Sequence, residues 1–158
     1  MKKHIFGLAR ICASVAALAM CAPAQAQTVQ NNNNTIGPSV QFGGGQSNFG
    51  IDSKFGVSDN LSLRPFIYFP SGGTNFGSAL TYDFHLPTTD NTLQITPFVG
   101  GAVDINNTNG SAITTASLVG GADLNLTDTV QLKAGVAVPL STDSGQTTAV
   151  TLGAGIRF

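Results

Sequence analysis

Eight charged residues fall on polar positions of an alternating sequence, where they could form ion pairs or transfer protons. Only 15 of the 158 residues are charged, seven Lys or Arg and eight Asp. The eight residues balance four positive against four negative charges: Asp52, Lys54, Arg64, Asp83, Asp104, Asp123, Lys133 and Arg157. Buried charges are tolerated when they are paired. We therefore interpret the eight as structural ion pairs, with a rearrangeable gate or a thin water path as the alternative.

Two local pairings follow if these residues lie on neighbouring strands. A tight turn at Thr127-Asp128 would place Asp123 opposite Lys133. A turn at Asp59 would place Arg64 diagonal to Asp52, with Asp83 on the other neighbouring strand. Opposite charges on facing strand positions attract each other, so the sequence predicts that losing Asp123 would leave Lys133 unpaired.

Nucleophilic or metal chemistry has little support in the sequence. His85 is the only histidine after residue 26, and it lies beside a turn, two residues after Asp83. No Cys/His cluster has metal-ligand spacing, and the Gly43-Gly44-Gly45 run is typical of a turn rather than a nucleotide site. We expect no catalytic, cofactor-binding or metal-binding residues, and neither a cofactor nor an enzyme activity. An enzyme that uses His85 is the alternative.

The first 26 residues have the three parts of a secretory signal peptide. Lys2, Lys3 and Arg10 are basic, residues 11–20 are apolar, and Ala24-Gln25-Ala26 is a small-residue cleavage site. This pattern predicts removal of residues 1–26, which also removes both cysteines, and a flexible leader over 27–35. One alternative is lipidation at Cys21, although Met20 is large for a lipobox; another is a buried amphipathic helix.

Period-two alternation of apolar and polar residues dominates the remainder, residues 36–158. It predicts eight β-strands, over residues 36–45, 49–57, 61–69, 76–84, 93–104, 117–126, 130–138 and 150–158. Tight Asp-containing turns are expected at 58–60 and 127–128, and a somewhat longer one at 86–91. Looser Gly/Ser-rich loops are expected at 44–48, 70–75, 106–111 and 141–146. Pro65 and Pro97 lack the N–H of a ladder hydrogen bond, so each predicts a bulge or a local break.

The polar face of these strands decides which side faces outward. It is mostly Gly, Ala, Ser and Thr and carries all four basic residues after position 26, and no charge interrupts the apolar face. Small residues and balanced charges suit the narrow interior of an eight-stranded barrel, and closure leaves no unpaired edge in lipid. The predicted fold is an all-β, eight-stranded antiparallel up-and-down transmembrane β-barrel after a cleaved signal peptide. A soluble β-sandwich is the alternative.

Composition excludes two other classes of protein. Without residues 1–26 the chain has four basic and eight acidic residues, hence a net charge of −4, and no basic patch. We therefore expect no nucleic-acid partner. No run of 18 apolar residues remains, which excludes a membrane-spanning helix in this part.

The last strand resembles that of a known family. Residues 150–158 alternate and end on a terminal Phe, which is similar to the C-terminal signal of small bacterial outer-membrane β-barrel proteins of the OmpA transmembrane domain, OmpX and opacity-protein type. The resemblance covers about residues 36–158. It implies export to the bacterial outer membrane, with outer-membrane lipid and the barrel assembly machinery as partners. The implied assembly signal consists of Val150, Leu152, Ile156 and Phe158.

The resemblance also implies an orientation and a role. The termini and the tight turns would face the periplasm, and the Gly/Ser-rich loops, about five to seven residues long, would face outside. These loops are shorter than those of family members that bind host surfaces. We expect a monomeric, non-enzymatic integral barrel with a structural role in the envelope, its lumen filled by small residues and paired charges. A narrow porin-like channel for ions or small solutes is the alternative.

Overall fold

The computed structural model describes residues 34–86, 93–108, 110–140 and 147–158. The predicted signal peptide at 1–26, the Cys21 alternative and the 141–146 loop lie outside these residues, as do most of the leader and of the 86–91 turn. Within the described ranges, no helix is long and apolar enough to cross a membrane.

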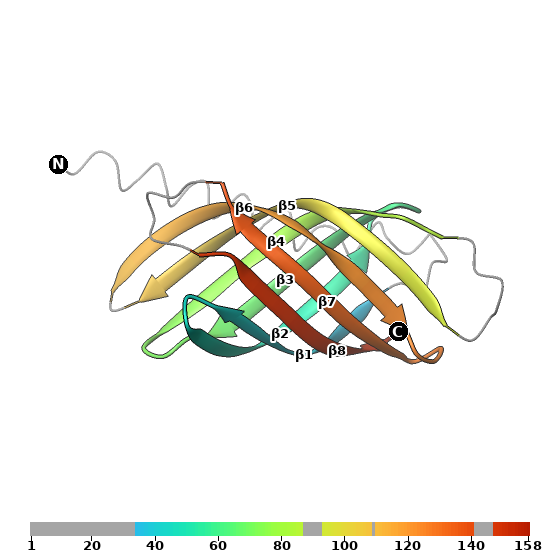
Figure 1. The fold of residues 1–158 in the computed structure, drawn as a ribbon, viewed down its shortest axis with the longest axis horizontal. Helices are drawn as coiled ribbons and strands as arrows, with labels where there is room; N and C mark the ends of the chain where they lie inside the picture. The colour runs from blue at the N-terminus through green and yellow to red at the C-terminus, as the bar shows by residue number, and fades with distance from the viewer. Residues whose placement is uncertain (1–33, 87–92, 109, 141–146) are drawn as a thin grey trace. The chain divides into compact units, whose positions relative to one another are not determined.

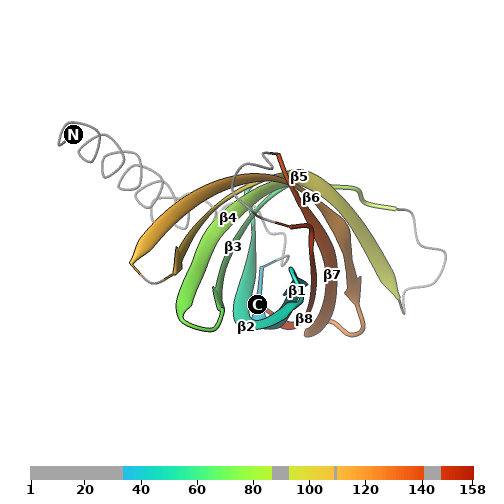
Figure 2. The same cartoon turned by 60° about the vertical axis from the view of Figure 1, so that its left-hand side comes forward.

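Eight antiparallel strands close into one barrel, each hydrogen-bonded to the strands before and after it, with β1 pairing β8 (Figures 1 and 2). This confirms the predicted fold; β1 begins at Thr35, one residue before the expected start of the barrel. The strands are β1 Thr35–Gly43, β2 Gln46–Gly56, β3 Leu61–Phe69, β4 Gly73–Asp83, β5 Gln94–Thr108, β6 Ser111–Asn125, β7 Val130–Pro139 and β8 Ala149–Arg157.

The apolar face of the strands is on the outside. Leu132, Leu152 and Phe84 are 38%, 51% and 43% exposed, whereas Arg64 and Lys133 are only 9% and 8% exposed. In the described part of the chain, the buried hydrophobic residues are Tyr68, Ala79 and Ala102. A soluble sandwich would show the reverse distribution, with its large apolar side chains in a dry core. The soluble alternative is therefore wrong.

Aromatic side chains lie on the outer wall near both ends of the barrel. Phe49 and Phe69 are paired in register near the Gly/Ser-rich turns. At the other end, the rings of Phe55 and Phe158 pack edge to face with centroids 6.5 Å apart. Two such girdles are typical of barrels that meet the two surfaces of a bilayer.

The connections differ from the sequence expectation. The Gly/Ser-rich end has short turns: two residues, Gly44 and Gly45, join β1 to β2, and three residues, 70–72, join β3 to β4. Four residues, 57–60 and 126–129, form each fully described turn at the Asp-containing end. The prediction of loose loops at 44–48, 70–75 and 106–111 is wrong. Gly44 and Gly45 have positive φ values of 59° and 76°, which allow a two-residue hairpin.

Pro65 interrupts the β2–β3 pairing without adding a residue, whereas Pro97 is paired with Ala122 of β6. The pairs Asp52↔Phe66 and Phe55↔Leu63 keep the same β2–β3 register on both sides of Pro65, and no paired residues are recorded between them. Pro97 lies just beyond Asp83↔Phe98, the last pair of the β4–β5 ladder. At Pro65 the structure shows a local break, which is one of the two predicted outcomes. It shows no bulge there, because the register is unchanged.

Candidate functional site

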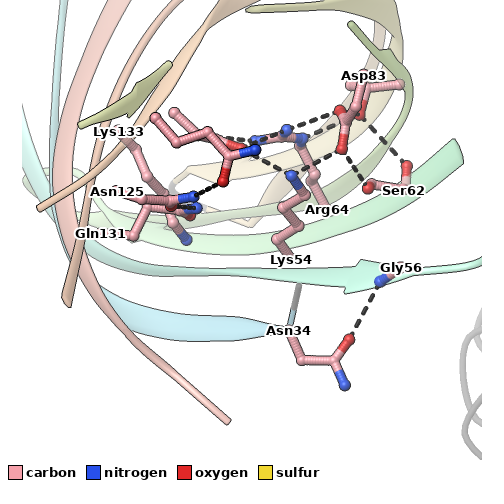
Figure 3. Close-up of polar contacts among 12 residues, drawn as sticks. Asn34, Lys54, Gly56, Ser62, Arg64, Asp83, Asn125, Gln131 and Lys133 are labelled. Atoms are coloured by element: carbon pink, nitrogen blue, oxygen red, sulfur yellow. Dashed lines mark hydrogen bonds and ion pairs between the residues drawn. The ribbon is translucent and has the colours of Figure 1, made fainter. Parts of the chain in front are cut away.

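Four charged side chains from four strands meet inside the barrel (Figure 3). Lys54 Nζ of β2 lies 2.7 Å from Asp83 Oδ2 of β4 and 2.9 Å from Asp123 Oδ2 of β6. Arg64 Nη2 of β3 lies 3.0 Å from Asp83 Oδ1 and 2.8 Å from Asp123 Oδ2. We call these four residues the charge cluster. Each cation contacts both carboxylates, so the cluster links β2, β3, β4 and β6 across the lumen.

The β2–β3 register explains why two cations share two acids. Extending the register past Pro65 places Lys54 beside Arg64 on adjacent strands, where like charges repel each other. The two side chains are compensated by Asp83 and Asp123, which are 2% and 0% exposed. Desolvated charges of this kind are stable only with close partners that satisfy their hydrogen bonds. The cluster is therefore a single electrostatic unit rather than two independent pairs.

Neutral side chains hold the cluster in one geometry. Arg64 Nε donates to Thr81 Oγ1 at 2.9 Å, and the guanidinium carbon lies 3.7 Å from the centroid of the Phe98 ring. Ser62 Oγ donates to Asp83 Oδ2 at 2.6 Å. The sequence analysis did not single out Ser62, Thr81 or Phe98. Their positions could have indicated them, because each lies an even number of residues from an inward-facing charged residue on its own strand and so shares its face.

A second ion pair joins Lys133 of β7 to Asp52 of β2. The pair crosses over β8 and β1, where Gly153 is in register with Lys133 and Gly37 with Asp52. A Cβ on Gly153 would lie 3.2 Å from Asp52 Oδ2. A Cβ on Gly155 would lie 3.3 Å from Lys133 Cε, so Gly153 and Gly155 leave the space through which the lysine reaches its partner.

The predicted partner of Lys133 was wrong. Asp123 is directly opposite Lys133 in the β6–β7 register, as expected, but its carboxylate bonds Arg64 and Lys54 instead. Long basic side chains can reach across a narrow lumen, so sequence neighbours do not determine which charges meet. Losing Asp123 would leave Lys54 and Arg64 to share the single carboxylate of Asp83, and Lys133 would keep its partner Asp52.

The other two predicted charges lie on β8 and β5. Arg157 is in register with Thr35 at the Asp-containing end. Asp104 of β5 is 7% exposed, and its Oδ2 atom has no hydrogen-bond partner. The structure therefore brings six predicted residues into two ionic groups and leaves Asp104 apart from them.

A polar chain lies near the Asp-containing end of the lumen. Gln131 Nε2 donates to Asn125 Oδ1 at 2.7 Å, and Asn125 Nδ2 donates to Gln94 Oε1 at 3.1 Å (Figure 3). Gln131 and Asn125 are 1% and 7% exposed. These amides were not predicted as site residues. They fill the part of the lumen next to the charge cluster.

The other half of the lumen contains a cavity of about 470 Å³. It extends from Arg64, Asp52 and Lys133 to residues at the Gly/Ser-rich turns, such as Gly44 and Ser71. The aromatic side chains of its wall are Phe66, Tyr68 and Phe98, and Asp104 also lines it. The lumen is thus hollow on one side of the charge cluster and filled by side chains on the other.

His85 and the residues predicted as the assembly signal do not line this cavity. The Nε2 atom of His85 lies 2.6 Å from the carbonyl oxygen of Asp59, in an exposed turn at the Asp-containing end. Across the described ranges, no three His, Cys or Asp side chains are placed to hold a metal ion. The four residues predicted as the assembly signal point outward from β8 or its end, at 45–60% exposure: Val150, Leu152, Ile156 and Phe158.

Known structures share this architecture. No protein-family model and no curated protein matches the sequence. The N-terminal β-barrel domain of Pseudomonas aeruginosa OprF is similar, with a TM-score of 0.57 at 18% identity over 80% of this chain and 98% of that one. A de novo designed transmembrane β-barrel also has a TM-score of 0.57, at 13% identity over 82% of this chain and 98% of the other. The chain therefore has the fold of small transmembrane β-barrels.

Proposed function

We propose that this chain is a monomeric, non-enzymatic barrel of the bacterial outer membrane whose role is structural. Its outer wall is apolar between two aromatic girdles, as lipid requires. Each strand pairs on both sides, which removes the unpaired edges that a bilayer does not tolerate. An envelope role needs such a wall and a lumen that does not leak.

The observation that carries the proposal is the charge cluster. Its four side chains come from β2, β3, β4 and β6 and bond one another at 2.7–3.0 Å. Removing one partner from a buried pair typically costs about 3–5 kcal/mol. A solute that passed through would have to separate charges held at this strength, so the closed state is favoured.

Conductance of the purified barrel in planar bilayers tests the proposal. We expect no unitary currents from the unaltered protein. The matched comparison is the double variant Lys54→Met/Asp83→Leu, which removes one cation and one anion and keeps the net charge. Steady unitary currents from the unaltered barrel would overturn the structural role.

A narrow channel for ions or small solutes is the second candidate. The cavity of about 470 Å³ favours it, because the hollow part of the lumen already reaches Arg64, Asp52 and Lys133. Only the charge cluster and the polar chain beside it would then need to move. Currents in the unaltered barrel that disappear when Asp52, at the cavity floor, is replaced by Leu would support this function.

We base the proposed absence of enzyme activity on the position of His85. Its ring contacts a backbone carbonyl rather than a hydroxyl or carboxylate side chain, and a general base needs a nucleophile within hydrogen-bond reach. If the barrel has a lipid- or peptide-hydrolysing activity that is lost in His85→Ala, the proposal fails. The matched control is Asp59→Ala, which alters the same turn but keeps the imidazole.

We propose the assembly machinery as a transient partner because of the position of the last strand. Phe158 is 60% exposed next to Phe55 of β2, so its ring is available before the barrel closes. We expect removal of Phe158 to slow insertion while the final fold is kept. Heat-modifiable gel migration, followed over time in assembly reactions, measures this; equal rates for the intact and shortened chains would contradict it.

A further inference from the structure

Asp104 differs from the other carboxylates of the lumen. Asp52, Asp83 and Asp123 each bond a Lys or Arg side chain. Asp104 is 7% exposed, and its Oδ2 atom has no hydrogen-bond partner. An isolated buried carboxylate is unfavourable unless something pairs with it.

The residues that face Asp104 from the neighbouring strands carry no positive charge. Gly77 of β4 and Thr115 of β6 are directly in register with it. Asn75, diagonal to it on β4, is its polar neighbour. Asn75 Oδ1 and Thr115 Oγ1 also lack hydrogen-bond partners, and these residues are 8% and 1% exposed. The carboxylate oxygen of Asp104 and the amide oxygen of Asn75 only accept hydrogen bonds, so their missing partner is a donor.

Gly77 packs closely against β5, where a Cβ would collide with the Val103 carbonyl oxygen. The registers place Phe66, Gly77 and Asp104 side by side across β3, β4 and β5. A Cβ on Gly77 would lie 2.8 Å from the Cβ of Asp104. No side chain lies between Phe66 and Asp104, and both residues line the cavity.

The cavity has the size and lining of a small-molecule site. Its volume of about 470 Å³ lies within the roughly 300–1,000 Å³ that ligand pockets occupy. The rings of Phe66 and Tyr68 lie 5.6 Å apart and offer an apolar surface for the body of a ligand. The cations at the cavity floor, Arg64 and Lys133, are already neutralised by their own acids.

We propose that this wall binds a small primary amine, with the ammonium group on Asp104 and the apolar body along Phe66 and Tyr68. A primary ammonium supplies three N–H donors and a positive charge, which the Asp104 carboxylate and the Asn75 side-chain carbonyl oxygen lack, and both residues line the cavity. Binding uses only the half of the lumen beyond the charge cluster. The proposal therefore does not depend on whether the barrel conducts.

The test is a titration of the purified barrel in nanodiscs, followed by amide NMR. The probe is 2-phenylethylamine, and 2-phenylethanol is its neutral counterpart. We expect saturable shifts for the amine at residues 75–77, 104 and 115, and none of comparable affinity for the alcohol. No saturable binding of the amine, or equal binding of the two, would overturn the proposal. Saturation by sodium or calcium chloride at these amides, but not by the amine, would show a metal-ion site instead and overturn it as well.

Variants separate the site from general effects of charge. Asp104→Asn keeps the shape of the side chain, and we expect it to weaken amine binding by about tenfold or more, as for a charge-assisted hydrogen bond. Asp59→Asn, in an exposed turn, is the matched control and should bind as the unaltered barrel does. Equal affinity in Asp104→Asn and the control would contradict the assignment, and heat-modifiable migration establishes that each variant is folded.

Discussion

The two halves of the lumen use the same residue types with opposite results. Toward the Asp-containing turns, Asp83 and Asp123 are nearly inaccessible and each contacts two cations. Toward the Gly/Ser-rich turns, Asp104 is also buried but has no cation, and it borders a cavity. In one half the charged side chains pair with one another. In the other half the wall carries hydrogen-bond acceptors that have no donor.

The two halves differ because of how far the basic side chains extend and where the small residues lie. Lys54 and Arg64 lie side by side on β2 and β3 and extend to acids of β4 and β6. Lys133 reaches Asp52 past Gly153 and Gly155, whose missing side chains leave room for it. Gly77 is directly in register with Asp104, and the polar side chain beside Asp104 on β4 is the neutral Asn75. A lumen carboxylate is therefore neutralised, or left at the border of the cavity, according to whether a cation lies within reach.

Three isosteric substitutions rank the lumen carboxylates, and Asp123→Asn should have the largest effect. It leaves Lys54 and Arg64 with one carboxylate between them at a site where Asp123 is 0% exposed. We expect a loss of about 3–5 kcal/mol in the free energy of unfolding. Urea titration in lipid vesicles measures it, with gel migration as the signal because the chain has no Trp.

The control for this measurement is Asp59→Asn, whose side chain is in an exposed turn. Its midpoint should match that of the unaltered barrel within error. If Asp123→Asn also leaves the midpoint unchanged, the charge cluster does not stabilise the closed lumen, and the contrast between the two halves fails.

Asp52→Asn should have a smaller effect of the same sign. Its side chain is 14% exposed and bonds a single lysine, so water replaces part of the lost interaction. We expect about 1–3 kcal/mol in the same titration. A loss as large as that of Asp123→Asn would show that Lys133–Asp52 belongs to one cooperative unit with the charge cluster.

The fold could be predicted from the sequence because its signal is local. Alternation assigns each residue to a face, and the basic residues Lys54 and Arg64 identify which face is inside. The strand ends were harder to predict, since a glycine turn such as Gly44-Gly45 fits both a loose loop and a two-residue hairpin. The observed register, not the composition, decides between them.

The contacts inside the lumen could be predicted only in part. Asp123 opposite Lys133 follows from a single turn, and that register is correct. The bond from Asp123 to Arg64 depends on the tilt of the strands and on how far a side chain extends across the barrel. Neither quantity is encoded in the spacing of residues along one strand, so the pairing of Lys133 with Asp52 was missed.

Asp104→Asn should have the smallest effect and the opposite sign. The substitution removes a buried charge that has no cation and keeps the size of the side chain, so the free energy of unfolding should stay the same or rise by up to about 1 kcal/mol. The urea titration that ranks the other two variants measures this directly, without added amine. A loss comparable to that of Asp52→Asn would mean that Asp104 already has a stabilising partner inside the barrel. Both halves of the lumen would then be saturated, and the wall beside Gly77 would have no acceptor to offer a ligand.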